Sequence, residues 1–143
     1  MKSVQELLQA KGHGVFAVEP DASVYDALQL MADKNVGALL VLDAGKLVGV
    51  ISERDYARKV ILQGRASKTT PVREIMTAQV VSAQADQTIE EAMVLMSNKR
   101  IRHLPVLDGE RLVGVISIGD VVKAVAISGK QTFDQLSRLS LTW

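Results

Sequence analysis

An internal duplication constrains this chain more than any other feature of its sequence. The segment LVGVISERD at residues 47–55 returns as LVGVISIGD at residues 112–120. The offset of 65 residues holds without a gap from about 15/80 to 60/125, and 17 of the 43 positions between residues 18–60 and 83–125 are identical. Such self-similarity predicts two copies of one structural unit that pack about a pseudo-twofold axis.

In each copy an apolar run leads into a serine, two variable residues and an aspartate. This pattern is typical of a strand that runs into the start of a helix. Ser52 and Ser117 are natural N-caps, and Asp55 and Asp120 then fall near the third helical position. Two interpretations stay open here: a capping box alone, or a hydroxyl, N–H and carboxylate set that holds a polyhydroxylated anion such as a nucleotide. Duplication of the pattern at a constant offset favours the second.

Apolar spacing predicts the same order of elements in both copies. The first copy should contain a strand at 15–18, a helix at 24–34, strands at 38–42 and 47–52, and a helix at 53–63. The second should contain a strand at 80–81, a helix at 88–99, strands at 104–107 and 112–117, and a helix at 118–128. A short helix is expected near residues 4–9 and a helical turn at 72–76. The fold class is therefore α/β (α+β), with two βαββα repeats. Residues 1–70 should contain the N-terminal helix and the first repeat, residues 71–129 the second repeat, and residues 130–143 a C-terminal tail.

Composition excludes several classes of function. Without cysteine, the chain has no disulfide, no thiolate metal site and no cysteine nucleophile, and two histidines do not make up a zinc site. Aromatic residues are 3% of the chain and the net charge is +1, which argues against a nucleic-acid partner. No apolar run approaches twenty residues, so neither a signal peptide nor a membrane span is expected. We expect a soluble, cytoplasmic protein.

No catalytic pattern is present in the sequence. It has neither a G-x-x-x-x-G-K-[ST] nor a G-x-G-x-x-G loop, and no nucleophile stands with a base and an orienting group. The sequence therefore predicts a protein that is not an enzyme.

The combined pattern resembles the tandem cystathionine-β-synthase (CBS) domain pair, or Bateman module. The resemblance covers roughly residues 8–128 and depends on the two GVISxxD segments, the run RIRHLPV at 100–106 and the hinge EIMT at 74–77. In that family, clefts between the repeats bind AMP, ADP, ATP, NAD(H) or S-adenosylmethionine and so regulate a partner. The resemblance is to stand-alone, signal-transduction members, because no catalytic domain accompanies the pair.

The resemblance also assigns roles to residues. Asp120 and Asp55 would accept hydrogen bonds from ribose hydroxyls, and Arg102 would reach a phosphate. Residues 77–81 would line the adenine side of the Asp120 site, and residues 11–16 would do so in the first copy. The predicted binding residues are Ser117, Gly119, Asp120, Arg102, His103, Pro105, Thr77, Val80, Val81, Ser52, Arg54, Asp55, Lys11 and Phe16.

The two copies differ beside the predicted site. Residues 102–105 are RHLP in the second copy, whereas the matching residues 37–40 of the first are GALL. The first copy instead carries Arg54, Arg58 and Lys59 on its second helix. Arg54 and Arg58 are one helical turn apart, either as ligand contacts or as a solvated face. Two alternatives stay open here: each cleft binds its own ligand, the same or a different one, or one longer ligand reaches between them. AMP or NAD(H) is the expected ligand, and a dinucleotide suits the asymmetry.

A homodimer is the expected assembly. Apolar residues on the last helix of each copy are expected to be exposed, and pairing of like faces would cover them; they are Tyr56, Val60, Ile61, Leu62, Val121, Val122, Val125 and Ala126. The alternative to a regulatory module is a constitutive dimeric scaffold or interaction protein with vestigial clefts. The sequence names neither the regulated protein nor the exact nucleotide.

Overall fold

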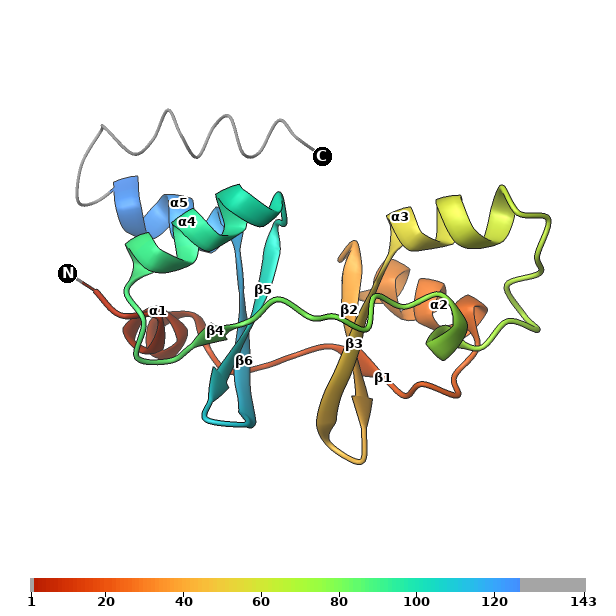
Figure 1. Cartoon of the computed structure of the whole chain (residues 1–143), viewed down its shortest axis with the longest axis horizontal. Helices are drawn as coiled ribbons and strands as arrows, with labels where there is room; N and C mark the ends of the chain where they lie inside the picture. Colours follow the sequence, from red (N-terminus) through yellow and green to blue (C-terminus); the bar gives the residue numbers. More distant parts are fainter. Residues whose placement is uncertain (1, 127–143) are drawn as a thin grey trace. The chain divides into compact units, whose positions relative to one another are not determined.

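The computed structural model describes residues 2–126, which divide into two compact units. We call residues 15–80 the central unit, and residues 2–14 with 81–126 the terminal unit. Each contains one copy of the βαββα order with its own three-stranded sheet, so the expected α/β fold is confirmed (Figure 1). The tail expected at residues 130–143 lies outside the described residues.

The central unit is built on a mixed sheet of order β1-β2-β3. Strand β1 (Ala17–Val18) runs parallel to β2 (Ala38–Asp43), which runs antiparallel to β3 (Lys46–Ser52). Helix α2 (Val24–Lys34) starts where the Ser23 side chain accepts the Asp26 N–H, and it packs its buried face into the core beside the sheet. This core is aliphatic, as the composition requires.

The helix expected at residues 53–63 is not one regular α-helix. Helix α3 (Glu53–Tyr56) continues as a π-helix, η1 (Ala57–Ile61), in which the Leu62 N–H reaches back to the Ala57 carbonyl at 3.2 Å. The wider turn still places Val60 fully inside the core. Single π turns are frequent near functional sites, and this one carries Lys59.

The terminal unit repeats the same sheet. Strand β4 (Ala83–Gln84) is parallel to β5 (His103–Asp108), which is antiparallel to β6 (Arg111–Ser117). Helices α4 (Ile89–Lys99) and α5 (Ile118–Ala126) pack their buried faces into this unit's core.

The first strand of each copy differs from its prediction. The strand expected at 80–81 is wrong, because pairing with β5 begins at Ala83, opposite Val106. In the first copy only Ala17 and Val18 of the expected four residues pair with β2. Both strands are too short for apolar spacing to locate their ends.

Segments that precede one copy pack on the other. Helix α1 (Val4–Lys11) belongs to the terminal unit, where the Val4 N–H bonds to the Gln87 carbonyl at 2.8 Å. The short 3₁₀ turn η2 (Val72–Glu74) belongs to the central unit, where the Val72 N–H bonds to the Ala22 carbonyl at 2.8 Å. The compact units therefore cross the repeat boundary expected at residues 70/71.

Two equivalent glycines receive these exchanged segments. A Cβ on Gly114 of β6 would lie 2.7 Å from Leu8 Cδ2, and one on Gly49 of β3 would lie 2.6 Å from Met76 Sδ. Only glycine allows such close approach. This explains why the glycine of LVGV is present in both copies.

The apolar faces expected at a dimer interface are only partly exposed. Val60, Val121 and Val125 are buried in the cores of their own units, so the prediction is wrong for these three residues. Ile61 and Leu62 are 55% and 76% exposed. Within residues 2–126, no helix combines the length and apolarity needed to cross a membrane.

Candidate ligand-binding site

Asp120 is fixed at the start of α5 by reciprocal hydrogen bonds with Ser117. The Asp120 N–H donates to Ser117 Oγ at 3.1 Å, and Asp120 Oδ2 accepts the Ser117 N–H at 2.8 Å. The same capping geometry recurs at α1 with Ser3 and Glu6 and at α4 with Thr88. Capping alone therefore does not single out Asp120.

A lysine distinguishes Asp120 from the ordinary caps. Lys11 Nζ lies 2.6 Å from Asp120 Oδ2 and also donates to the Val115 carbonyl at 2.7 Å. Among residues 2–126, the cap carboxylates of Glu6 and Glu91 have no such ion pair. The lysine comes from α1, the segment exchanged between the copies.

Asp120 is held as a carboxylate. Burial by itself would raise its pKa, but the hydrogen bond from Lys11, the Ser117 N–H and the charge of Lys11 together hold the pKa of Asp120 below its usual range. An ionised carboxylate is a strong acceptor for hydroxyl groups, with each charged hydrogen bond contributing about 1.5–3 kcal/mol when sheltered.

Arg102 and His103 lie beside this helix start through the sheet register. His103 pairs with Ser117 across β5 and β6, and the Arg102 carbonyl accepts the Ile118 N–H at 2.8 Å. Desolvation by the surrounding protein lowers the pKa of His103, and the charges of Arg102 and Lys11 lower it further, against the opposing effect of Asp120. His103 is therefore neutral at neutral pH, when it can donate or accept a hydrogen bond.

A cavity of about 730 Å³ opens next to Asp120. It lies within the terminal unit and is lined by Lys2, Glu6, Leu7, Gln9, Ala10, Lys11, Asp120, Lys123 and Ala124. Three lysines face two carboxylates, Glu6 and Asp120, in this lining, so its net charge is positive and favours an anionic group. The volume is in the range of small-molecule sites.

Asp55 repeats the cap in the central unit. Its Oδ2 accepts the Ser52 N–H at 3.0 Å and the Ser52 hydroxyl at 3.1 Å, while its own N–H donates to Ser52 Oγ at 3.1 Å. The register is also repeated, since Ala38 pairs with Ser52 and the Gly37 carbonyl accepts the Glu53 N–H. Gly37 and Ala38 thus stand where the terminal unit has Arg102 and His103.

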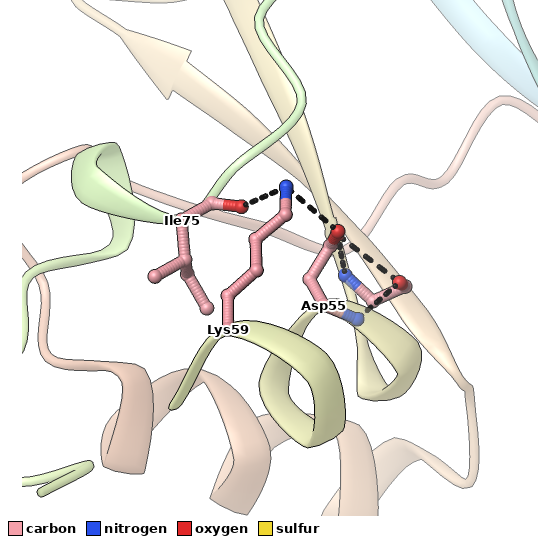
Figure 2. Close-up of polar contacts among 4 residues, drawn as sticks. Asp55, Lys59 and Ile75 are labelled. Atoms are coloured by element: carbon pink, nitrogen blue, oxygen red, sulfur yellow. Dashed lines mark hydrogen bonds and ion pairs between the residues drawn. The ribbon is translucent and has the colours of Figure 1, made fainter. Parts of the chain in front are cut away.

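Asp55 also has a lysine partner, Lys59, which was not among the predicted binding residues. Figure 2 shows the Lys59 side chain reaching from its helix toward both Asp55 and the Ile75 backbone. Its Nζ lies 3.3 Å from Asp55 Oδ1 and donates to the Ile75 carbonyl at 3.0 Å. The i,i+4 spacing of Asp55 and Lys59 was the signal that would have found it.

The comparisons with known proteins identify the family. A model of the CBS domain matches residues 12–61 and 72–127. The chain belongs to the CBS domain family. The expected resemblance to a tandem CBS pair is confirmed, because the domain matches twice along one chain.

Two curated relatives are named for their CBS domains alone. CBS domain-containing protein CBSX3, mitochondrial, of Arabidopsis thaliana is 43% identical over 122 residues, which cover 82% of this chain and 59% of that protein. CBS domain-containing protein YhcV of Bacillus subtilis is 36% identical over 121 residues, which cover 85% of this chain and 84% of the relative. This CBS chain thus spans just under three-fifths of the Arabidopsis protein and most of the Bacillus one.

Solved CBS structures share the fold. A protein with CBS domains from Burkholderia ambifaria is 49% identical with a TM-score of 0.84, covering 90% of this chain and 97% of that one. The CBS domain pair of protein MJ0100, in complex with 5′-methylthioadenosine and S-adenosyl-L-methionine, is 26% identical with a TM-score of 0.77. The match covers 90% of this chain and 99% of that one.

The structure distributes the predicted CBS site residues differently from the expectation. Lys11 was expected in the first copy but contacts Asp120 in the terminal unit. Thr77 was expected near Asp120 but pairs with Val50 of β3 in the central unit. The reason is the exchange of segments, which carries residues 11–14 to one unit and residues 71–80 to the other.

The remaining predicted residues divide between the units. Val81 and the buried Pro105 belong to the terminal unit, as Asp120 does, and Val80 belongs to the central unit with Asp55. Phe16 is 45% exposed, with Lys34 Nζ 5.5 Å from its ring centre. Arg54 is exposed on α3, and Gly119 lies on α5 directly before Asp120.

Proposed function

We propose that this CBS pair is a regulatory module that binds adenosine nucleotides at sites built around Asp120 and Asp55 and signals by a change of conformation. The observation that carries the proposal is the ionised Asp120 carboxylate, held at the start of α5 beside a cavity of about 730 Å³. An anionic acceptor of this kind suits the paired hydroxyls of ribose.

Basic residues support a ligand that carries phosphate. Lys11 and Lys123 line the cavity with Asp120, and Arg102 lies next to this helix start, where its carbonyl accepts the Ile118 N–H. The structural relative bound to 5′-methylthioadenosine and S-adenosyl-L-methionine supports an adenosine group in particular. Within this class we propose AMP or NAD(H), with ADP, ATP and S-adenosylmethionine as further ligands to test.

A thermal-shift screen of AMP, ADP, ATP, NAD, NADH and S-adenosylmethionine tests the proposal. A ligand that binds only the folded state adds RT ln(1 + [L]/Kd) to the free energy of unfolding, about 2.7 kcal/mol at a hundredfold excess over Kd. We expect at least one of these compounds to raise the melting temperature by several degrees. If none does so, the sites are vestigial and the chain is a constitutive scaffold or interaction protein.

We also propose a homodimer that contacts through the exposed residues Ile61 and Leu62. These neighbours at the end of η1 are the large apolar side chains most exposed to solvent among the described residues, and closed twofold pairing covers such a patch simply. Light scattering should return about twice 15.5 kDa. Leu62→Lys should shift the mass toward the monomer, and a monomeric wild-type protein at micromolar concentration would contradict the proposal. A cytoplasmic location and an unidentified regulated protein stay predictions.

A further inference from the structure

The two aspartates differ in how much hydrogen-bonding capacity they have left. A carboxylate offers about four acceptor positions, two on each oxygen. Asp55 uses both positions on Oδ2 for the Ser52 N–H and hydroxyl, and Lys59 occupies Oδ1. One position therefore remains on Asp55 for any other donor.

Asp120 keeps a whole oxygen for a ligand. Its Oδ2 takes both the Ser117 N–H and the Lys11 ammonium, and the Ser117 hydroxyl also helps to lower the pKa of this carboxyl. The hydrogen bonds and ion pairs found within residues 2–126 leave Oδ1 open. Since a ribose donates two hydroxyl hydrogens, Asp120 can accept both without losing a contact. Asp55 cannot do so while Lys59 is in place.

Lys59 also connects Asp55 to a distant segment. Its ammonium donates to the carbonyl of Ile75, a fully buried residue at the end of η2 (Figure 2). Two residues further on, Thr77 exchanges two hydrogen bonds with Val50 of β3, at 2.9 and 3.0 Å. This stretch belongs to the segment that leads from the first copy to the second.

The Lys59 side chain can move away from Asp55. Its side chain is 47% exposed and the ion pair with Asp55 is 3.3 Å long, so water can replace the carboxylate at small cost. The same ammonium donates to the Ile75 carbonyl, so a movement of Nζ away from Asp55 also disturbs that bond.

We propose that Lys59 is a specificity-determining residue of the central unit: its ammonium competes with the ribose hydroxyls of an adenosine ligand for Asp55, and its release loosens the segment around Ile75 and Thr77. The inference rests on the proposed function and adds a regulation to it. Occupancy of the Asp55 site is thereby coupled to the chain segment between the copies. The Asp120 site binds without this competition.

Nuclear magnetic resonance titration with adenosine tests the competition for each unit separately. The amides of Ser52 and Asp55 report the central site, and those of Ser117 and Asp120 report the terminal site. Adenosine is used because it has the ribose without a phosphate that Lys59 would attract. We expect Lys59→Met to tighten binding at the central site about two- to fivefold, since an exposed ion pair contributes little, and to leave the terminal site unchanged.

A charge-matched variant controls for the lost cation. Lys46→Met removes the same charge from the start of β3, at the opposite end of that strand from Ser52, and should leave both affinities unchanged. Unchanged or weaker central binding in Lys59→Met would overturn the competition. Failure of the wild-type protein to bind adenosine at the central unit would overturn this inference, and the proposed function is removed only if the nucleotides of the thermal-shift screen also fail to bind.

Amide exchange without ligand tests the connection to Ile75. In Lys59→Met the amides of Val50 and Thr77 should exchange about two- to fivefold faster than in wild type, while the Leu40 amide, bonded to the Phe16 carbonyl, keeps its rate. Adenosine should accelerate the same two amides in wild type and have no further effect in Lys59→Met. Equal rates in the ligand-free proteins would overturn the coupling even if the affinities change as expected.

Discussion

Equivalent aspartates in the two units pair with lysines from different segments of the chain. In the terminal unit Lys11 reaches Asp120 from α1, more than a hundred residues away along the chain, whereas in the central unit Lys59 reaches Asp55 from the same helix. Both ammonium groups also bond to a backbone carbonyl, of Val115 or Ile75. Duplication thus preserves the backbone of the helix start, while the balancing charge is supplied by whichever segment lies nearby.

The lysines leave the two carboxylates with different free acceptor positions. Lys11 shares one oxygen with the cap, so it favours the ionised carboxylate without closing it to a ligand. Lys59 takes the other oxygen and ties Asp55 to Ile75. If the proposed function holds, we expect tighter ligand binding at the terminal unit and a change of conformation at the central unit.

Disrupting the packing of helix α1 on the terminal unit should have the strongest effect. Leu8→Ala removes a wholly buried side chain that contacts Gly114, and a cavity of this kind lowers the free energy of unfolding by about 2–5 kcal/mol. Urea unfolding measures the loss. Amide exchange should locate it in β6 of the terminal unit, with smaller changes in β3.

Two variants sharpen this prediction. Leu7→Ala, at a half-buried neighbour on the same helix, should cost clearly less than Leu8→Ala. Met76→Ala, the counterpart against Gly49, should also cost less, because Met76 is half-buried and flexible. A loss below about 1 kcal/mol for Leu8→Ala would show that α1 is not part of the terminal core.

The next effect compares the carboxylates directly. Asp120→Ala should weaken the adenosine ligand about ten- to hundredfold, because two ribose hydroxyls lose a charged acceptor and each factor of ten is about 1.4 kcal/mol. Asp55→Ala should have a smaller effect, since Asp55 already has Lys59 as a partner. Calorimetry of each variant measures both.

Ligand analogues separate binding from capping in this comparison. A 2′,3′-dideoxy analogue should bind the wild-type protein poorly and Asp120→Ala little worse. Equal affinity of wild type and Asp120→Ala for the intact ligand would mean that the aspartate is only a helix cap.

The sequence predicted the helices and strands that the two copies share, but not the unit on which the segment before each copy packs. Offset and apolar spacing were sufficient for the strands at 38–43 and 46–52, the helix at 24–34 and the serine caps, because these depend on local pattern. They could not assign residues 4–11 or 72–77 to a unit, since both copies offer the same LVGV strand and glycine. The Lys11–Asp120 contact follows from that assignment and so was paired with the wrong copy, whereas Lys59 was readable from its i,i+4 spacing.

The smallest effect concerns acid stability and depends on Lys11. Because the pKa of Asp120 is lower in the folded protein than its ordinary value near 3.9, its contribution to stability is present above that pH and is lost as the pH falls through the folded-state pKa. Lys11→Met removes the main lowering contact, so the variant should be less stable than wild type at neutral pH, by less than about 1 kcal/mol because Lys11 is 34% exposed. This difference should fade as urea unfolding is repeated at pH values progressively below the ordinary pKa near 3.9. Lys46→Met loses the same charge without an ion-pair partner among residues 2–126 and should show no such convergence. If the difference in the free energy of unfolding between wild type and Lys11→Met does not change with pH, Lys11 contributes through packing of α1 rather than through the charge of Asp120. Lys11 and Lys59 would then differ in position alone.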